Sequence, residues 1–577
     1  MPTTAVTADV FNVPAGQTVS AVGDTAVYVY NSPSGVATRV TIDGTLDARS
    51  SGGPWALDLN YEPSGTAPAT LGSIVIGTSG VLRATDSSSS GVAQGFRSEI
   101  FFDLTNNGLV EVTGSNAIGI YGLRSEDRVT NHGTIRVQGD DVRGIAMDYG
   151  ATIVNGGLIE VTGARSAIGI SSGDFASIPG SILNTGSIRV HDSGASVVSV
   201  GVFVTTPGGV TNSGLIEADV AIRTATTSAA QLIPIVNTGQ LIGSVEAIFH
   251  GADFTNSGLV TGDVRMGDAD DRYDGRLGRV NGLVHGGGGA DLLMGSFSAE
   301  TLSGDAGDDT IEGGGGADVL DGGGGFDMLS YAHSPTAQTL DLSQPFSVGS
   351  AVNFEGVIGS GFDDSMSGSS SAESLAGGAG NDTVMAGAGN DTIDGGSGTS
   401  YLRGEDGNDS IAGGSAFDDI NGNMGNDTAH GNGGDDWVVG GKDQDQLFGD
   451  AGGDVVWGNL GNDTLDCGDG ADQVRGGQGD DVVNGGAGND FVSGDRGNDT
   501  ITGGTGADLF HDSQDASIDR VLDFSVAEGD RVMLDPGTTY TVSQVGADTV
   551  IDMGGGNQMI LVGVQMSTLP PGTIFLG

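Results

Sequence analysis

The chain has 577 residues, and its 75 Asp and Glu residues so outnumber its 21 Lys and Arg residues that the formal net charge is −54. Nucleic acids and anionic lipid headgroups bind proteins through Lys and Arg side chains, so this composition excludes both as partners. Hard cations are the expected partners instead.

Disulfides and membrane anchoring are not expected. The only cysteine, Cys467, cannot form a disulfide within the chain, so the 107 Gly residues must be held in place by some other device. No stretch approaches the roughly 18 apolar residues of a spanning helix, so membrane insertion is not predicted. The N-terminus has no Lys or Arg before Arg39 and no long apolar run, unlike a cleavable secretory signal.

Residues 1–100 are rich in Thr, Val and Ser and contain alternating runs such as residues 27–30, which predicts a β-rich cap or the start of a solenoid. Over residues 101–285 a nine-residue phrase recurs at intervals of 19 to 29 residues. This spacing predicts one coil of a right-handed parallel β-helix for each repeat. Each phrase contains an Asn, and stacked Asn side chains can form hydrogen bonds from rung to rung. These are Asn106, Asn131, Asn155, Asn184, Asn212, Asn237 and Asn256.

The third phrase, IVNGGLIEV from Ile153, illustrates the expected register. Ile159 and Val161 should face the core, while Leu158 and Glu160 should face outward. The repeated phrase resembles the passenger repeats of autotransporter-type bacterial surface adhesins, and this resemblance implies a surface-exposed β-helix.

From Gly286 the sequence falls into nonapeptides, five of them over residues 286–330 and seventeen over residues 359–511. The sixth position is a carboxylate in 21 of the 22 units, the fourth is Gly in 17, and the eighth is always apolar. Ca²⁺ prefers six to eight oxygen ligands, including carboxylates and backbone carbonyls. Gly allows a tight loop that can direct carbonyl oxygens toward an ion, and the apolar eighth residue can be buried in a short strand.

This pattern resembles the calcium-binding nonapeptide repeats of the repeats-in-toxin (RTX) family. The resemblance implies a parallel β-roll in which two nonapeptides close one coil and each ion lies between residues i and i+18. Pairing the units in this way gives 3 sites in the first block and 15 in the second, of which two include Ser400, so roughly 16 ions are expected. The metal ligands that the resemblance implies are Asp291, Asp309, Asp318, Asp327, Asp364, Asp382, Asp391, Asp409, Asp418, Asp427, Asp436, Asp445, Asp454, Asp463, Asp472, Asp481, Asp490, Asp499 and Asp508.

Several units depart from the pattern. Ser400 replaces the carboxylate, and Glu300 and Glu373 are longer than Asp, so their sites are in doubt. The units without Gly at the fourth position are also in doubt. Those fourth residues are Ser298, Phe362, Ser371, Ala416 and Asp443.

Residues 331–358 resemble an insert that separates roll blocks in many RTX proteins, and they should form extra strands. Residues 512–577 resemble the β-rich C-terminal cap and export signal of type I secretion substrates. This resemblance implies that the type I secretion machinery is a partner and that the protein is secreted.

No catalytic site is predicted. A β-helix followed by RTX repeats is also the layout of secreted mannuronan C5-epimerases, but His132, His191, His250 and His285 are scattered and none lies in the epimerases' Asp-Pro-His-Glu motif. The pattern GxSxG around Ser171 lies in β-helix sequence without a strand-to-helix turn. A zinc protease is not expected either, because no His-Glu-x-x-His sequence is present.

The sequence therefore predicts an all-β protein with a parallel β-helix, a calcium-binding β-roll and a β-rich C-terminal cap. The leading functional hypothesis is a secreted, self-associating structural or adhesive protein at the surface of a Gram-negative bacterium. The alternatives are a carbohydrate-active enzyme, such as a polysaccharide epimerase or lyase, and an adhesin that binds cell-surface polysaccharide.

Overall fold

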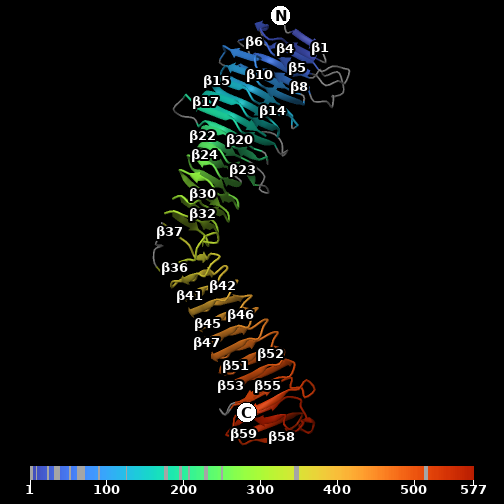
Figure 1. Cartoon of the computed structure of the whole chain (residues 1–577), viewed down its shortest axis with the longest axis vertical. Helices are drawn as coiled ribbons and strands as arrows, with labels where there is room; N and C mark the ends of the chain where they lie inside the picture. The colour runs from blue at the N-terminus through green and yellow to red at the C-terminus, as the bar shows by residue number, and fades with distance from the viewer. Residues whose placement is uncertain are drawn as a thin grey trace. The chain divides into compact units, whose positions relative to one another are not determined.

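The computed structural model describes most of the chain. The residues outside the description are 1–3, 8–9, 23–24, 31–38, 51–52, 61–71, 89–90, 100, 125, 174–179, 194–197, 206–207, 226–231, 249–250, 344–349 and 513–516. The chain forms two compact units, Met1–Asp327 and Met328–Gly577. In each unit short strands stack like rungs (Figure 1), and the only described helix is the 3₁₀ turn Met566–Thr568. The predicted all-β solenoid is thus confirmed, and no described helix has the length and apolar character to cross a membrane.

In the first unit the coils contribute strands to two parallel stacks, which we call sheets A and B. A coil can place two strands in sheet A, as β12 (Leu109–Thr113) and β13 (Asn116–Gly122) do. The strands of sheet A include β9 (Val81–Asp86), β12 (Leu109–Thr113), β15 (Thr134–Met147), β17 (Leu158–Ser172), β19 (Ser187–Asp192), β22 (Leu215–Thr224) and β24 (Gln240–Ala247). The strands of sheet B include β8 (Gly72–Ile76), β11 (Phe102–Asn106), β14 (Arg128–Asn131), β16 (Thr152–Asn155), β18 (Ser181–Asn184), β21 (Val210–Asn212), β23 (Ile233–Asn237) and β25 (Ala252–Asn256). The same stacking already includes β5 (Arg39–Ile42) and β6 (Thr45–Ser50), so coils begin within the first 100 residues.

The Asn of every phrase ends its strand in sheet B and pairs in register with the Asn of the next coil. Asn131 Nδ2 donates to Asn155 Oδ1 at 2.7 Å, and the same bond links all seven Asn residues from Asn106 to Asn256 at 2.7–2.8 Å. Each of these side chains is at most 1% exposed. The predicted Asn ladder is confirmed, as is the register of β17, where Ile159 and Val161 are fully buried.

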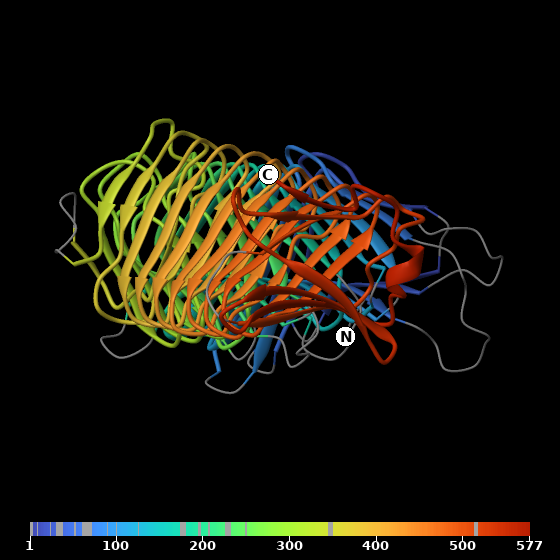
Figure 2. The same cartoon turned by 90° about the horizontal axis from the view of Figure 1, so that it is seen from below.

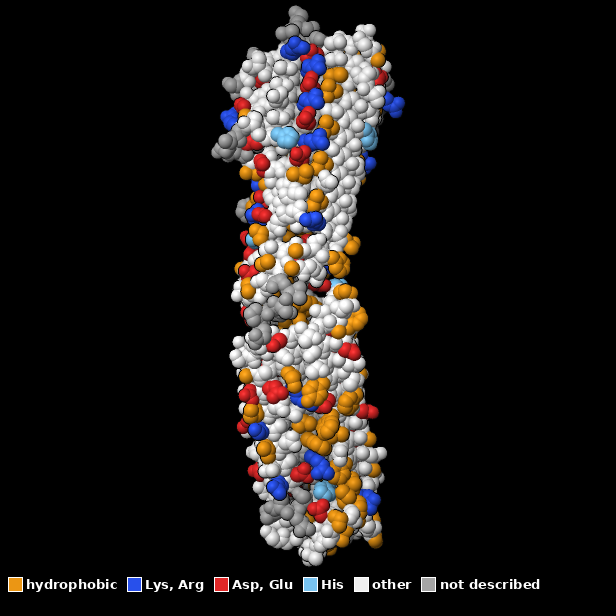
Figure 3. Space-filling model, turned by 60° about the vertical axis from the view of Figure 1, so that its left-hand side comes forward, with side chains coloured by type: hydrophobic (Ala, Val, Ile, Leu, Met, Phe, Trp, Pro, Cys, Tyr) orange, Lys and Arg blue, Asp and Glu red, His pale blue; other side chains and the backbone are white. Residues whose placement is uncertain are grey.

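A second ladder lies on the outer face of sheet A, where acidic and basic residues alternate from coil to coil. Figure 3 shows a column of alternating charges on this unit. Arg136 Nε lies 2.8 Å from Glu160 Oε2, and Arg83 Nε lies 2.8 Å from Glu111 Oε2. Exposed pairs of this kind contribute little stability, about 0–1 kcal/mol each, but a one-residue slip of the register would turn these charges toward the core. The members are Asp47, Arg83, Glu111, Arg136, Glu160, Arg189 and Glu217.

The second unit also has two parallel stacks, sheets C and D, whose strands lie in successive rows in Figure 2. Sheet C contains β39 (Ser365–Ser367), β41 (Thr383–Ala388), β43 (Tyr401–Asp406), β45 (Asp419–Met424), β47 (Trp437–Lys442), β49 (Val455–Leu460), β51 (Gln473–Gln478), β53 (Phe491–Arg496), β55 (Leu509–Asp512) and β57 (Arg531–Leu534). Sheet D contains β38 (Gly356–Ile358), β40 (Ser374–Ala376), β42 (Thr392–Gly396), β44 (Ser410–Gly414), β46 (Thr428–Asn432), β48 (Gln446–Phe448), β50 (Thr464–Asp466), β52 (Val482–Ala487), β54 (Thr500–Thr505) and β56 (Ile518–Val521).

The core between sheets C and D consists mainly of the eighth residue of each nonapeptide, such as Val438 and Val456, both fully buried. Residues 331–358 contribute β36 (Thr339–Asp341), β37 (Ser350–Val352) and β38. β36 pairs with β39, and β38 pairs with β40, so this segment adds strands to both sheets of the unit.

The C-terminal end of the second unit departs from parallel stacking. β58 (Thr541–Val545), β59 (Asp548–Gly554) and β60 (Asn557–Leu561) form an antiparallel meander, and β60 also pairs in parallel with β56. β61 (Ile574–Leu576) pairs with β57. The last strands of both sheets therefore have partners from the tail, which limits edge-to-edge aggregation at this end.

Replacing one Asn of the ladder tests its contribution to the first unit. Asn131→Ala removes the donor to Asn155 and the acceptor for Asn106, and leaves buried polar groups unpaired at a cost of about 1–3 kcal/mol each. We expect a lower denaturant midpoint, measured by circular dichroism. Asn107→Ala, the same change at a half-buried position beside the ladder, should shift the midpoint by much less. Equal shifts would contradict a special role for the ladder.

Candidate calcium sites

The sixth-position carboxylates form a second kind of ladder. Asp436 Oδ1 accepts the backbone N–H of Asp418 at 2.8 Å, and Asp454 Oδ1 accepts the N–H of Asp436 at 2.8 Å. Similar bonds, most of them 2.7–3.0 Å long, join each rung to the next through all nineteen Asp residues implied by the RTX resemblance. All nineteen side chains are buried. The structure thus brings together the whole predicted set.

The second oxygen of each carboxylate points back over its own loop. A Cβ atom on Gly431 would lie 2.6 Å from Asp436 Oδ2, and one on Gly449 would lie 2.6 Å from Asp454 Oδ2, so a side chain at the first position crowds the carboxylate. Gly occupies this position in all but two units, where Ala386 and Cys467 replace it. Within the described part of the chain, many of these Oδ2 atoms are buried and have no hydrogen-bond partner. They belong to Asp291, Asp309, Asp382, Asp391, Asp409, Asp418, Asp427, Asp436, Asp445, Asp454, Asp463, Asp472, Asp481, Asp490 and Asp508.

The loops turn through left-handed backbone conformations at their second and fourth positions. In the unit that starts at Gly431, Asn432 has φ 70° and Gly434 has φ 138°. A Cβ on Gly452 would lie only 1.4 Å from the carbonyl oxygen of Gly434, so successive fourth glycines pack directly on the carbonyl of the previous turn. The backbone carbonyls of adjacent turns therefore lie close together beside the buried carboxylates.

This arrangement fits Ca²⁺. In the described residues no group of three or more His, Cys, Asp and Glu side chains is placed to hold a metal ion, so the backbone has to supply some of the ligands. Two carboxylates of successive turns supplemented by backbone carbonyls are a donor set that Ca²⁺ accepts. The orphaned, buried Oδ2 atoms need a cationic partner, because an isolated buried carboxylate is costly. Residues such as Asp436 and Asp454 would hold such an ion together with loop carbonyls.

The ladder is longer than the sequence predicted. Asp271 Oδ1 accepts the N–H of Ala252 at 2.6 Å, Asp519 Oδ1 accepts that of Asp499 at 3.1 Å, and Asp530 Oδ1 accepts that of Asp508 at 3.0 Å. The nonapeptide pattern does not include these three residues, because each lies 19 to 22 residues after its partner in the ladder instead of 18. Their shared signal is an Asp followed by Arg and a buried residue: Tyr273, Val521 and Val532.

The fifth position also forms a ladder that the sequence pattern left undefined. Asn408 Oδ1 accepts the N–H of Asn426 at 2.8 Å, and Asp435 Oδ1 accepts that of Gly453 at 2.9 Å. These side chains are exposed and bond toward the following turn, whereas the sixth-position carboxylates bond toward the preceding one. Neighbouring side chains in one loop therefore tie it to both adjacent turns.

The departures from the repeat pattern alter individual rungs. The N–H of Asp382 is 3.4 Å from Ser400 Oγ, a weak contact that brings no charge. Glu300 bonds within its own loop through the N–H of Ser296 at 2.5 Å, and Glu373 does so through the N–H of Ser369 at 3.2 Å. Glu300 also accepts the backbone N–H of Val280 in the previous turn, so its longer side chain bonds both within its loop and to the preceding coil. Asp443, the fourth residue of its unit, adopts φ 77°, so it takes the left-handed conformation of the Gly it replaces.

Burial raises the pKa values of the ladder carboxyl groups when no metal is bound. Desolvation raises the pKa of Asp436 from its ordinary value of 3.8 to about 7, and the neighbouring charges of Asp454 and Asp418 add to the shift. The same causes raise the pKa of Asp445 to about 7 and that of Asp481 to about 8. The ladder without metal therefore favours protonated carboxyls, while Ca²⁺ binding requires deprotonated ones.

Comparison with known proteins identifies the repeats. The family model described as the RTX calcium-binding nonapeptide repeat matches residues 294–329, 367–402, 394–429, 403–438, 430–465, 457–492, 468–501 and 484–511. No curated protein matches the chain. Among solved structures, the extracellular lipase LipA from Serratia marcescens aligns at 18% identity with a TM-score of 0.18, over 38% of this chain and 40% of the lipase. The chain thus spans less than half the length of that protein.

The raised pKa values predict an unusual pH dependence for the metal-free protein. Between the ordinary pKa of 3.8 and the raised value of about 7, the folded chain binds more protons than the unfolded chain. Its free energy of unfolding should therefore fall as the pH rises through this interval. Circular dichroism in a chelator active at both pH values should show more stable β structure near pH 5 than near pH 8. With saturating Ca²⁺ the trend should disappear or reverse, and a chelated protein that gains stability toward pH 8 would contradict the account.

Two adjacent residues allow a matched test of the sites. Asp436→Asn keeps an acceptor oxygen but removes the charge that two neighbouring sites would share, those with Asp418 and Asp454. Equilibrium dialysis with ⁴⁵Ca should show a loss of about two ions. Asp435→Asn makes the same chemical change at the exposed fifth position, where the amide oxygen can still accept from Gly453, and should bind as many ions as the wild type. Equal losses in both variants would rule out the assignment.

Proposed function

We propose, from the RTX calcium-binding repeats in its C-terminal half, that this chain is a secreted, non-enzymatic protein with a structural or adhesive role at the surface of a Gram-negative bacterium. It would form part of a surface layer, filament or matrix. The observation that carries the proposal is the long ladder of buried carboxylates, whose unmatched oxygens make the fold depend on a metal that is abundant outside the cell.

Export follows from the same dependence. Extracellular calcium modules bind with dissociation constants of about 10⁻⁴–10⁻³ M, so their sites stay empty in the cytosol. Stacked carboxylates without metal repel one another, and the roll would remain unfolded until it leaves the cell. An unfolded chain suits a type I secretion channel, and residues 512–577 would carry the export signal.

A structural role also accounts for the β-helix residues that could be considered as catalytic groups. Tyr121 Oη donates to Asp148 Oδ2 at 2.6 Å, a pairing of the kind that an active site could use. Burial and the bond to Asp148 raise the pKa of Tyr121, whereas a catalytic base would need a lowered one. Ser171 is buried within β17 and not exposed on a turn, and His250 lies outside the described residues.

Calcium would also promote association between copies. The surface carries many exposed carboxylates in addition to the buried ladder, among them Asp308, Asp406 and Asp469. Ions that bridge such groups can neutralise two facing acidic surfaces. The protein would then remain dispersed at low calcium and assemble at the cell exterior.

Light scattering of the purified full-length protein tests this proposal. We expect a dispersed species in chelator and calcium-dependent assemblies at millimolar Ca²⁺. Mg²⁺ at the same concentration serves as a control for simple charge screening and should be much less effective. A strict monomer at all calcium and protein concentrations, together with turnover of an acidic polysaccharide, would favour the carbohydrate-active enzyme instead.

A further inference from the structure

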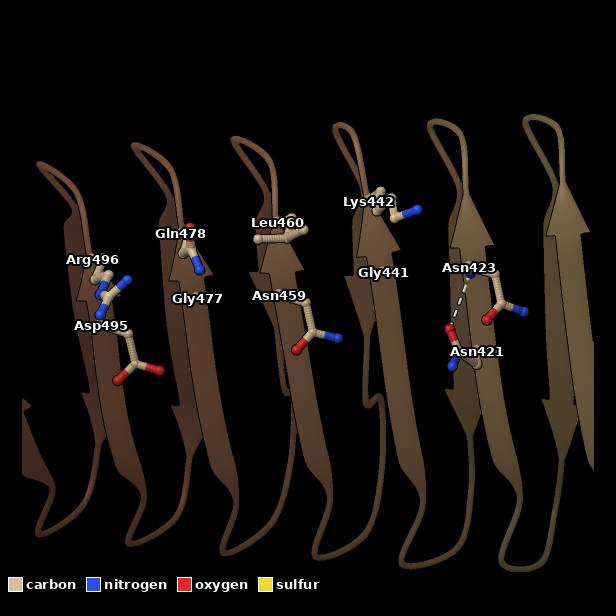
Figure 4. A pocket seen from close by; sticks show the side chains of 10 residues that line it. All are labelled: Asn421, Asn423, Gly441, Lys442, Asn459, Leu460, Gly477, Gln478, Asp495 and Arg496. Carbon is tan, nitrogen blue, oxygen red and sulfur yellow. Dashed lines mark hydrogen bonds between the residues drawn. The ribbon is translucent and has the colours of Figure 1, made fainter.

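A shallow groove of about 650 Å³ crosses five neighbouring strands of sheet C, from β45 to β53. Figure 4 shows the side chains that line it, which come from successive strands of the stack. The groove therefore runs perpendicular to the strands, and each step along it is one strand spacing, about 4.8 Å.

Glycines at every second rung hollow out the groove. The second positions of the five units lie in register, and they alternate between residues with side chains (Asn423, Asn459 and Asp495) and the glycines Gly441 and Gly477. All five have positive φ, which explains why only Gly, Asn and Asp occur here. The side chains thus recur every two rungs, about 9.6 Å apart, with an open space at each glycine between them.

Cations are concentrated at this groove. Residues 286–577 contain 48 Asp and Glu but only six Lys and Arg. Three of the six line the groove or the smaller hollow that adjoins it: Lys442, Arg475 and Arg496. Arg475 lies 3.6 Å from Asp495. In the described part of the chain neither Lys442 nor Arg496 forms an ion pair, and Lys442 Nζ instead contacts the sulfur of Met424.

The adjoining hollow supplies an aromatic ring and donors without partners. Trp457, Gln473 and Arg475 line it, and it shares Asn459 and Asp495 with the groove. Trp457 Nε1 is buried and has no hydrogen-bond partner in the described structure, and the same is true of Asn423 Nδ2 in the groove itself. Either side chain can turn toward a ligand oxygen without breaking a hydrogen bond within the protein.

We propose that this groove binds a linear glycan built of carboxylated sugars, laid along the stack of sheet C. The two-rung repeat is close to the length of a disaccharide in an extended polysaccharide. Every second sugar would therefore lie beside one of the three side chains that recur along the groove, which are Asn423, Asn459 and Asp495. The Asn side chains can form hydrogen bonds with sugar hydroxyls, and the ring of Trp457 can pack against the apolar face of a sugar. Lys442 and Arg496 can form charge-assisted hydrogen bonds with the sugar carboxylates.

The charge pattern favours this occupant over a second copy of the chain or a neutral glycan. A neutral sugar chain gains nothing from the two unpaired cations, and an extended peptide has a repeat of about 6.6–6.8 Å that matches neither one rung nor two. The net charge of −54 does not prevent binding, because carboxylates beyond about 8 Å are screened at physiological ionic strength. Asp495 lines the groove itself, and Arg475, 3.6 Å away, offsets its charge. The inference rests on the proposed function only through the need for a calcium-folded roll.

Calorimetry on the full-length, calcium-loaded protein tests the inference, with a uronic-acid hexasaccharide as the probe. The double variant Lys442→Gln/Arg496→Gln should weaken binding at least tenfold, since it removes both cations that would form charge-assisted hydrogen bonds with the sugar carboxylates. Arg520→Gln, which removes one of the same six cations from β56 in sheet D, should bind like the wild type. Binding through free calcium would leave the double variant with the affinity of the wild type, because all variants share the same buffer.

Two further ligands decide between occupants. A neutral glucose hexasaccharide should bind at least tenfold more weakly than the uronate, and hexaglutamate, which offers the same charges on a peptide, should also bind weakly. Equal affinity for either ligand, or an unchanged affinity of the double variant, would overturn the proposal. If the double variant fails to fold, quenching of wild-type tryptophan fluorescence by the uronate should be lost in Trp457→Phe and kept in Trp55→Phe. Assembly is measured separately, so either proposal can fail without the other.

Discussion

The hydrogen bond that a turn side chain makes to the next coil is the constraint on which the rest of this structure depends. In the β-helix that side chain is Asn, which both donates and accepts, so each ladder member satisfies its neighbours: Asn131 accepts from Asn106 and donates to Asn155. In the roll it is Asp, which only accepts. Asp436 Oδ1 finds a backbone N–H, but Oδ2 remains buried without a partner, and the next carboxylate lies one turn away. A cation completes the Asp ladder of the roll, whereas the Asn ladder of the β-helix is complete by itself.

This difference explains the sequences of the two halves. A neutral Asn rung needs no particular loop, so the coils of the β-helix vary in length between their phrases. Alternating ion pairs such as Arg136 and Glu160 lie on their surface. A carboxylate rung needs room for its second oxygen and carbonyls close by. Gly431 and Gly434 meet these needs at the first and fourth positions, and neither tolerates a Cβ. The strict nonapeptide period is thus the consequence of building one loop site in each half of every 18-residue coil.

Much of this could be predicted from sequence because each feature repeats. The Asn ladder and the inward face of β17 follow from a recurring phrase, and the alignment of the Asp residues follows from a fixed period, since equivalent residues of a solenoid must stack. What escaped prediction lacked the period. Asp271, Asp519 and Asp530 extend the ladder after longer coils, and the fifth-position ladder of Asn408 and its equivalents was hidden in a variable position. The groove beside Trp457 depends on which side chains become neighbours across five strands, and no local pattern encodes that.

Hydrogen exchange read by mass spectrometry, on the same full-length protein with calcium and with chelator, tests the central claim most directly. The account predicts that amides in residues 359–511 are protected in calcium and exchange freely in chelator near pH 8, while the strands that end at the Asn ladder, such as β14 and β16, stay protected in both conditions. Equal protection of residues 359–511 with and without metal would show that the carboxylate ladder holds by itself. That result would contradict the account.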